Sequence, residues 1–237
     1  MLRFMPVGDS MTIGSAGEHT WRYRIWQHLR ATHGAPFELV GPRETLYDKA
    51  TGTADSHAYA DDCDPAFPRA HLAGWGEGWC HLGPLVADAV RASRADVLLV
   101  SLGLIDLGFY TNASQTTENV RAFIAQARSA NPRLSLVLLP VIPNIRAETD
   151  APFADEVARF NELLAKTAAN LSEPGSPLLL ASLPPTYDIH RDTYDGTHPN
   201  ASGEHKLAAA FAEALHQGWG MGGRYAGSPS PTARTST

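Results

Sequence analysis

Short apolar runs alternate along the chain with longer stretches whose apolar residues recur at helical spacing. A short apolar run bounded by turn-forming residues is typical of a buried strand, and helical recurrence is typical of an amphipathic helix. The expected strands are residues 2–7, 37–40, 97–102, 134–139 and 178–183. The expected helices are residues 21–33, 82–92, 116–130, 154–170 and 206–216. This alternation predicts an α/β fold, a three-layer α/β/α sandwich with a mostly parallel sheet.

Two segments do not follow this alternation. Residues 42–79 are rich in Gly, Asp and aromatic residues and show no clear period. A loop of that length inside a compact domain is usually functional or disordered. Residues 218–237 are rich in Gly and then contain Pro, a composition that favours flexible chain. We therefore expect one domain over residues 1–217, followed by a flexible C-terminal tail over residues 218–237.

The composition narrows the class of protein. The 237 residues include 19 Lys and Arg against 25 Asp and Glu, and this net charge of −6 argues against a nucleic-acid partner. No apolar run has the ~18–20 residues that a membrane-spanning helix requires, so no membrane partner is expected. The N-terminus lacks the regions of a signal peptide, which predicts a cytoplasmic protein, or a secreted one if a leader has been removed.

Neither a metal ion nor an organic cofactor is expected. The ten histidines form no H-E-x-x-H pattern, and no glycine-rich nucleotide-binding motif occurs. The two cysteines, Cys63 and Cys80, are too few for a disulfide scaffold or a structural zinc site. They could be two free thiols or form one bridge.

The residues that follow the predicted strands carry the candidate chemistry. Ligands of open parallel α/β sheets bind at the carboxyl ends of the strands, and Ser10 comes just after the first of them. A serine nucleophile requires a neighbouring base, and Asp195 and His198 supply a carboxylate and an imidazole in the loop before the last helix. In an Asp-x-x-His turn the carboxylate can reach Nδ1 and leave Nε2 free for the serine. Each motif alone could instead be a helix cap, a turn or a surface loop.

Two motifs at opposite ends of the chain make the sequence resemble the SGNH (GDSL-type) hydrolase superfamily over about residues 3–215. Residues 8–11 read Gly-Asp-Ser-Met and resemble the superfamily's first block. Residues 195–200 read Asp-Gly-Thr-His-Pro-Asn and resemble its last block. The resemblance implies a flavodoxin-like fold, and it assigns the nucleophile, the base and the orienting acid to Ser10, His198 and Asp195.

The resemblance also implies an oxyanion hole, to which Ser10 contributes its backbone amide. The superfamily's second block supplies a glycine amide. The stretch His-Leu-Ala-Gly-Trp at residues 71–75 matches that block best, which assigns the role to Gly74. Gly76 and Gly78 are close rivals.

The third block of the superfamily departs from its pattern in this chain. The block reads G-x-N-D, but residues 103–106 read Gly-Leu-Ile-Asp, so Ile105 stands where an asparagine would donate a hydrogen bond. Losing one such donor typically slows catalysis ~100- to 1000-fold. Asn112 and Asn144 both follow strand ends and are candidates to replace it.

The leading functional hypothesis is a serine-dependent esterase that cleaves an O-acyl ester of a carbohydrate or secondary metabolite through an acyl-enzyme. The expected partner is therefore a small-molecule ester, and the oligomeric state is left open. An acyltransferase is an alternative, because an apolar residue at position 105 makes the site drier. Elimination or cyclisation by the His–Asp pair, and a degenerate ligand-binding protein, are further alternatives. The expected substrate-binding residues are Asp9, Trp75, Ile105 and Asp106.

Overall fold

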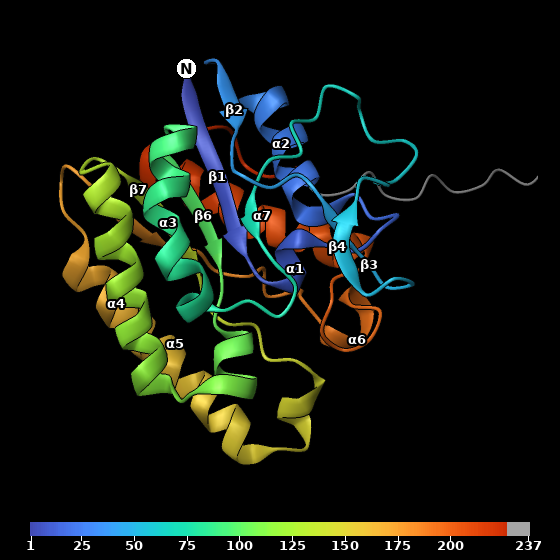
Figure 1. Ribbon diagram of the computed structural model, residues 1–237, viewed down its shortest axis with the longest axis vertical. Helices are drawn as coiled ribbons and strands as arrows, with labels where there is room; N and C mark the ends of the chain where they lie inside the picture. Colours follow the sequence, from blue (N-terminus) through green and yellow to red (C-terminus); the bar gives the residue numbers. More distant parts are fainter. Residues whose placement is uncertain (227–237) are drawn as a thin grey trace, which may run out of the picture.

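A central parallel sheet runs through the computed structural model, which describes residues 1–226 (Figure 1). Its strands lie in the order β2-β1-β6-β7-β8, and β5 pairs with the end of β1. All of these pairs are parallel. The strands are β1 (Leu2–Gly8), β2 (Phe37–Leu39), β5 (Leu72–Ala73), β6 (Val97–Ser101), β7 (Ser135–Leu139) and β8 (Leu178–Leu180).

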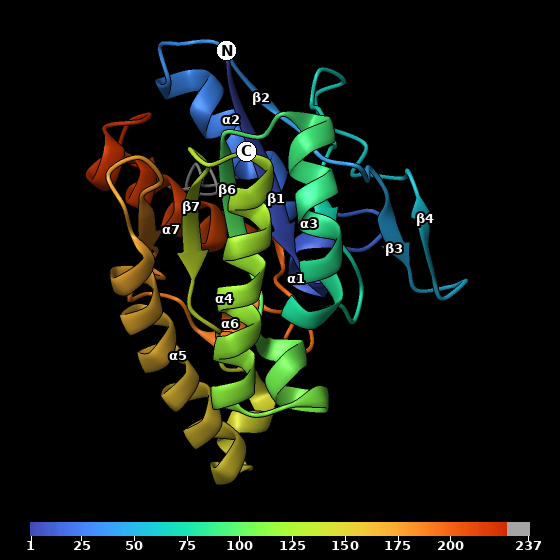
Figure 2. The ribbon, with the colours of Figure 1, turned by 60° about the vertical axis from the view of Figure 1, so that its left-hand side comes forward.

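Helices cover both faces of this sheet (Figure 1 and Figure 2). The long helices are α2 (Thr20–Thr32), α3 (Trp79–Ser93), α4 (Ala113–Ala130), α5 (Ala151–Leu171) and α7 (Ala201–Trp219). Alternate residues of β6 enter two cores: Leu98 and Val100 pack under α3, α4 and α5, whereas Val97 and Leu99 pack with α2 and α7. The predicted three-layer α/β/α sandwich with a mostly parallel sheet is confirmed. No helix within residues 1–226 is long and apolar enough to cross a membrane.

The long helices begin earlier than their apolar spacing predicts, and in three of them a polar side chain caps the start. Asn112 accepts a hydrogen bond from an amide in the first turn of α4, and Asp150 does the same for α5. Asn200 accepts two such bonds from the first turn of α7. Short helical turns also occur, namely α1 (Ser10–Ile13), the π-helix η1 (Asp106–Tyr110), the 3₁₀ turn η2 (Ile145–Glu148) and α6 (Ile189–Asp192).

The segment 42–79 has more regular structure than its sequence predicts. It forms the antiparallel pair β3 (Leu46–Asp48) and β4 (Thr53–Ser56), and then returns as β5. The guanidinium of Arg22, a fully buried residue of α2, ties this segment to α1. It donates hydrogen bonds of 2.8–3.0 Å to the Thr12, Ile13 and Arg69 carbonyl oxygens and the Tyr59 hydroxyl.

The first residues of the segment predicted as a tail, from 218 on, are ordered in the structure. Gly218 and Trp219 complete α7, and residues 220–226 turn back along the helical layer. The Tyr225 amide donates to Glu213 at 2.9 Å, and His28 Nε2 lies 3.0 Å from the Gly223 carbonyl oxygen. The last part of the predicted tail, residues 227–237, lies outside the described residues. The two cysteines are free thiols, so the alternative of a bridge is wrong.

Arg22→Ala should destabilise the protein by about 3 kcal/mol, because it leaves several buried carbonyl oxygens without a donor. Urea unfolding measures this change. Arg91→Ala is the matched control, since Arg91 lies exposed on α3 and pairs with Asp88 three residues away. The control should stay within about 0.5 kcal/mol of the wild type. Equal losses in the two variants would contradict the anchoring role of Arg22.

Candidate active site

Ser10 lies where β1 leaves the sheet and enters α1. Gly8 ends the strand in such close packing that a Cβ there would lie 2.8 Å from the Ser101 carbonyl oxygen, so the position requires glycine. Asp9 then caps α1, since its Oδ1 accepts a hydrogen bond from the Met11 amide at 3.0 Å. These constraints hold the Ser10 hydroxyl at the carboxyl end of the sheet.

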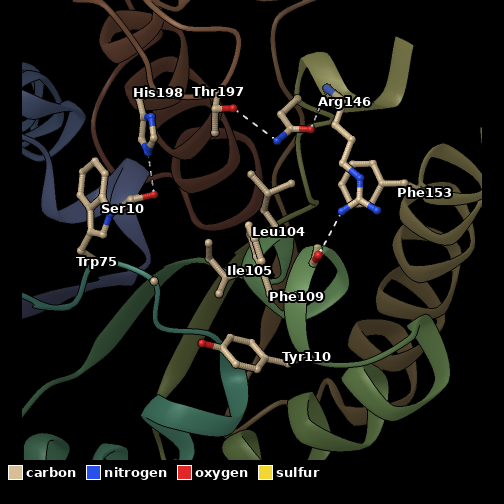
Figure 3. Close-up of a pocket in the computed structure, with 13 residues that line it drawn as sticks. Ser10, Trp75, Leu104, Ile105, Phe109, Tyr110, Arg146, Phe153, Thr197 and His198 are labelled. Atoms are coloured by element: carbon tan, nitrogen blue, oxygen red, sulfur yellow. Dashed lines mark hydrogen bonds between the residues drawn. The ribbon is translucent and has the colours of Figure 1, made fainter. Parts of the chain in front are cut away.

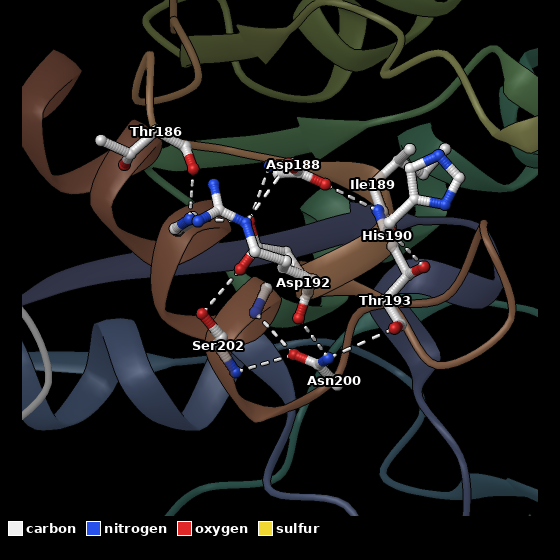
Figure 4. Close-up of polar contacts among 11 residues, drawn as sticks. Thr186, Asp188, Ile189, His190, Asp192, Thr193, Asn200 and Ser202 are labelled. Carbon is white, nitrogen blue, oxygen red and sulfur yellow. Dashed lines mark hydrogen bonds and ion pairs between the residues drawn. The ribbon is translucent and has the colours of Figure 1, made fainter. Parts of the chain in front are cut away.

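The loop before α7 is anchored by the buried carboxylate of Asp192 (Figure 4). Its oxygens accept hydrogen bonds from the Asp188 amide at 2.7 Å, the Ser202 hydroxyl at 2.6 Å and the Lys206 ammonium at 2.6 Å. Burial alone would raise the pKa of Asp192, but these hydrogen bonds, with that from Lys206 first, bring it below its usual value. The carboxylate therefore stays charged and joins α6 to the first turns of α7.

Asn200 and Thr193 fix the path of the same loop. Asn200 caps α7 with its Oδ1, while its Nδ2 donates to a carbonyl oxygen of α6 at 2.8 Å. The Gly196 amide donates to Thr193 Oγ1 at 2.8 Å and closes the turn between them. Asp195 and His198 consequently project from a loop that is tied at both ends.

This loop brings His198 against Ser10 (Figure 3). His198 Nε2 lies 3.0 Å from Ser10 Oγ, and His198 Nδ1 lies 2.7 Å from Asp195 Oδ2. The other carboxylate oxygen of Asp195 accepts hydrogen bonds from the Thr197 and His198 amides. Partial burial alone would raise the pKa of Asp195, but its hydrogen bonds with His198 lower it. The three side chains can therefore move a proton from the serine hydroxyl to an imidazole that a carboxylate orients.

Two aromatic side chains stack on the His198 ring. The ring centroid of Trp75 lies 4.7 Å from that of His198 and the centroid of Tyr194 lies 5.7 Å from it, both nearly parallel. Tyr47 stacks on Trp75 with 4.0 Å between the ring centroids, and Lys49 Nζ lies 3.8 Å from the centre of the Tyr194 ring. Trp75 is predicted from the sequence but neither tyrosine is. The place of Tyr194 beside the Asp-x-x-His turn is the signal that points to it.

Ser10 and His198 open into a pocket of about 400 Å³ (Figure 3). Trp75 and Ile105, two of the four predicted substrate-binding residues, line it. The pocket is also lined by side chains that the sequence analysis does not predict to be site residues. The sequence signal for some of them is the aromatic pair Phe109 and Tyr110, which follows the third block. These additional residues are Leu104, Phe109, Tyr110, Arg146 and Phe153.

The comparison with known families agrees with this geometry. Residues 7–206 match the GDSL-like Lipase/Acylhydrolase family. The chain belongs to this family. The resemblance to the SGNH (GDSL-type) superfamily is therefore confirmed, and the expected class of carboxylic ester hydrolase is confirmed at the level of the family.

Relatives of this GDSL-family chain include esterases of known structure. A multidomain esterase of Ruminococcus flavefaciens is 23% identical over 222 residues, which are 90% of this chain but 28% of that protein. A family 3 carbohydrate esterase from Talaromyces cellulolyticus is 20% identical with a TM-score of 0.74, covering 92% of this chain and 97% of its own. A family 3 carbohydrate esterase from Clostridium thermocellum is 19% identical with a TM-score of 0.70, covering 91% of this chain and 96% of its own. At these identities the likeness establishes the fold.

The three glycines considered for the GDSL-family oxyanion hole have different surroundings. The Gly74 amide donates to the Gly8 carbonyl oxygen at 3.2 Å, and Gly74 lines a neighbouring cavity beyond Trp75. The Gly78 amide donates to a ring nitrogen of α3 at 3.0 Å. Gly76 lines the Ser10 pocket, and within residues 1–226 its amide has no hydrogen-bond acceptor. The structure thus brings Gly76 to the pocket and leaves the predicted donor, Gly74, in the strand pairing.

Asp9 and Asp106, both predicted to bind substrate, are fully buried instead. Asp106 Oδ2 accepts a hydrogen bond from the Trp79 amide at 3.0 Å. Within residues 1–226, Asp9 Oδ2 and Asp106 Oδ1 have no hydrogen-bond partner. Burial, and after it the negative charge of Asp106, raise the pKa of Asp9 to about 7. Burial also raises the pKa of Asp106. Both carboxyls therefore belong to the packing around α1 and α3, not to the pocket wall.

Of the two asparagines considered for the missing donor, Asn144 reaches the pocket. Its Nδ2 donates to Thr197 Oγ1 at 3.3 Å. Asn112 caps α4 instead. Ile105, whose side chain has no donor, lies between Ser10 and Tyr110 in Figure 3, so that part of the wall is apolar.

Asp9→Asn should weaken the dependence of stability on pH between pH 5 and pH 8. The native pKa of Asp9, about 7, is above its ordinary value of 3.8, so the folded protein binds more protons and wild-type stability falls as the pH rises through this window. Each tenfold difference in proton affinity corresponds to about 1.4 kcal/mol, so the wild type should lose a few kcal/mol. Urea unfolding at several pH values measures the difference.

Asp150→Asn is the control for this experiment. Asp150 caps α5 at the surface, and the hydrogen bond from Arg146 lowers its pKa. Its contribution to stability is lost only as the pH falls below the window, so this variant should follow the wild-type slope. Parallel curves for the wild type and Asp9→Asn would show that Asp9 is not the group that titrates.

Proposed function

We propose that the protein is a serine esterase in which Ser10 forms an acyl-enzyme. The observation that carries this proposal is the hydrogen-bonded chain from Ser10 Oγ through the His198 ring to the Asp195 carboxylate. Membership of the GDSL-like Lipase/Acylhydrolase family supports the same chemistry.

The proposed reaction has two halves. His198 Nε2 takes the proton of Ser10 as its oxygen attacks the ester carbonyl, and the imidazolium then gives that proton to the leaving alcohol. Water, deprotonated by the same nitrogen, attacks the acyl-enzyme, and the imidazolium returns that proton to Ser10 Oγ as the bond to the acyl group breaks and the acid leaves. Asp195 remains ionised throughout and stabilises the imidazolium, for which its lowered pKa is suited.

Two backbone amides are the proposed donors to the oxyanion. The amide of Ser10 begins α1, and that of Gly76 belongs to the pocket wall, and within residues 1–226 neither has an acceptor of its own. The third donor of the superfamily pattern is missing because Ile105 occupies its position. Since one donor contributes ~100- to 1000-fold, we expect a slower enzyme than one with all three.

The substrate class that we propose is an O-acyl ester of a carbohydrate or of a secondary metabolite. Two of the solved relatives are carbohydrate esterases, which supports the first. Because the chain spans 28% of the multidomain esterase, that protein's activity is a guide to the reaction type only.

Ser10→Ala should reduce hydrolysis of p-nitrophenyl acetate by at least about 10⁴-fold, because the nucleophile is lost. A fluorophosphonate probe should label the wild type at Ser10 and leave this variant unlabelled. Ser15→Ala is the matched control, since Ser15 is a second buried serine near the site whose hydroxyl lies 3.4 Å from that of Tyr194. The control should keep both labelling and turnover. Retained turnover in Ser10→Ala would contradict Ser10 as the nucleophile.

Asp195→Asn should lower kcat by roughly 10³- to 10⁴-fold with little change in stability. The asparagine oxygen can still accept the loop amides, but the side chain loses the charge that stabilises the imidazolium. Steady-state kinetics and thermal unfolding on the same preparation test both halves of this expectation. A kcat within tenfold of the wild type would remove Asp195 from the mechanism.

A further inference from the structure

The polar groups of the Ser10 pocket gather at one end. Ser10, His198 and Thr197 lie along one wall in Figure 3, and Ser10 Oγ and His198 Nε2 lie 3.0 Å apart. Asn144, which also lines the pocket, donates a hydrogen bond to Thr197. An ester carbonyl bound for attack must lie at this end. Any larger group attached to it then extends toward the opposite end.

The opposite end is hydrocarbon and aromatic. Leu104 and Phe153 are buried in its wall, whereas Phe109 is 77% exposed and Tyr110 is 59% exposed at its rim. Large apolar side chains left in water at the mouth of a cavity often mark a binding surface. Rings such as these pack well against another ring, face to edge or offset.

The one lining side chain with a permanent charge, Arg146, is already engaged. Its Nε donates to Asp150 at 2.8 Å, and another guanidinium nitrogen donates to the Gly108 carbonyl oxygen at 3.0 Å. The guanidinium carbon lies 4.4 Å from the centre of the Phe153 ring. Arg146 thus braces η2 against η1 and α5 with two of its donors occupied, and its flat guanidinium stacks on Phe153, which suits another flat ring better than an anion.

The size of the pocket and the apolar side chain of Ile105 both favour a large apolar group next to the ester carbonyl. A volume of about 400 Å³ lies in the range that holds drug-sized ligands, and it is far more than an acetyl group fills. Ile105 lies between the serine and Tyr110, where a polar side chain would favour a hydrated group (Figure 3). A substrate group that extends from Ser10 toward Tyr110 therefore contacts an apolar side chain first.

We infer that this pocket selects an aromatic acyl group. The inference rests on the proposed acyl-enzyme: the acyl group stays on Ser10 inside the pocket, while the alcohol takes its proton from His198 and leaves. An acyl ring bound past Ile105 would cover the exposed faces of Phe109 and Tyr110. Ile105 and Phe109 are then specificity-determining residues, and the alcohol contributes less to selection.

The test compares p-nitrophenyl esters that differ only in the acyl group: acetate, hexanoate, benzoate and cinnamate. Each kcat/KM is divided by the rate at which hydroxide cleaves the same ester, which removes differences in intrinsic reactivity. The corrected value for an aromatic ester should exceed that for acetate by about tenfold or more. A highest corrected value for acetate or hexanoate overturns the inference.

Two variants connect the preference to the pocket. Phe109→Ala and Ile105→Asn should each lower the aromatic-to-acetate ratio about fivefold or more, since each removes apolar contact with the ring. The ratio does not depend on the fraction of folded protein, because both esters are measured on one preparation. Leu85→Ala is the matched control: Leu85 is an exposed leucine of α3 outside the pocket and should leave the ratio unchanged. Unchanged ratios in both pocket variants also overturn the inference.

Fluorophosphonate labelling separates this inference from the proposed function. Labelling of Ser10 together with an acetate preference contradicts the aromatic acyl pocket alone. Failure of the wild type to be labelled, or full turnover by Ser10→Ala, contradicts the acyl-enzyme and the inference with it.

Discussion

The buried carboxylate of Asp192 is the contact on which the candidate site depends. A charge in such a place is unfavourable unless it is paired and hydrogen-bonded, and Lys206, Ser202 and the Asp188 amide fill both oxygens. This arrangement fixes the start of α7 relative to α6. The turn between them then presents His198 at 3.0 Å from Ser10, two residues that lie 188 positions apart in the sequence.

The parts of the fold that the sequence predicts are those that depend on local pattern. The buried strands β6 and β7 are continuous apolar runs, and the long helices carry their period within a single segment. Residues 42–79 differ, because their order comes from Arg22, which reaches carbonyl oxygens far away along the chain. Residues 220–226 are held in the same manner by α2 and α7. Such contacts leave no periodic trace in the segment that they stabilise.

The candidate site likewise has residues that local motifs predict and features that depend on contacts distant in the sequence. Ser10, Asp195 and His198 can be predicted because each belongs to a short motif at the end of an element. The amide of Gly74 depends on how β5 pairs with β1, and the burial of Asp9 and Asp106 depends on how η1 packs against α3. The tyrosines that complete the aromatic stack come from β3 and from the loop before α7, and only the folded chain brings them together.

The order of the elements along the chain also affects how the protein is made. Chains fold in part while they are being synthesised, N-terminal segments first. The proposed nucleophile follows the first strand, which becomes a central strand of the sheet, whereas the base precedes the last described helix. A growing chain therefore carries an inert serine until α7 emerges and docks on α2. A chain that ends before residue 198 would lack the proposed base and, with it, the proposed activity.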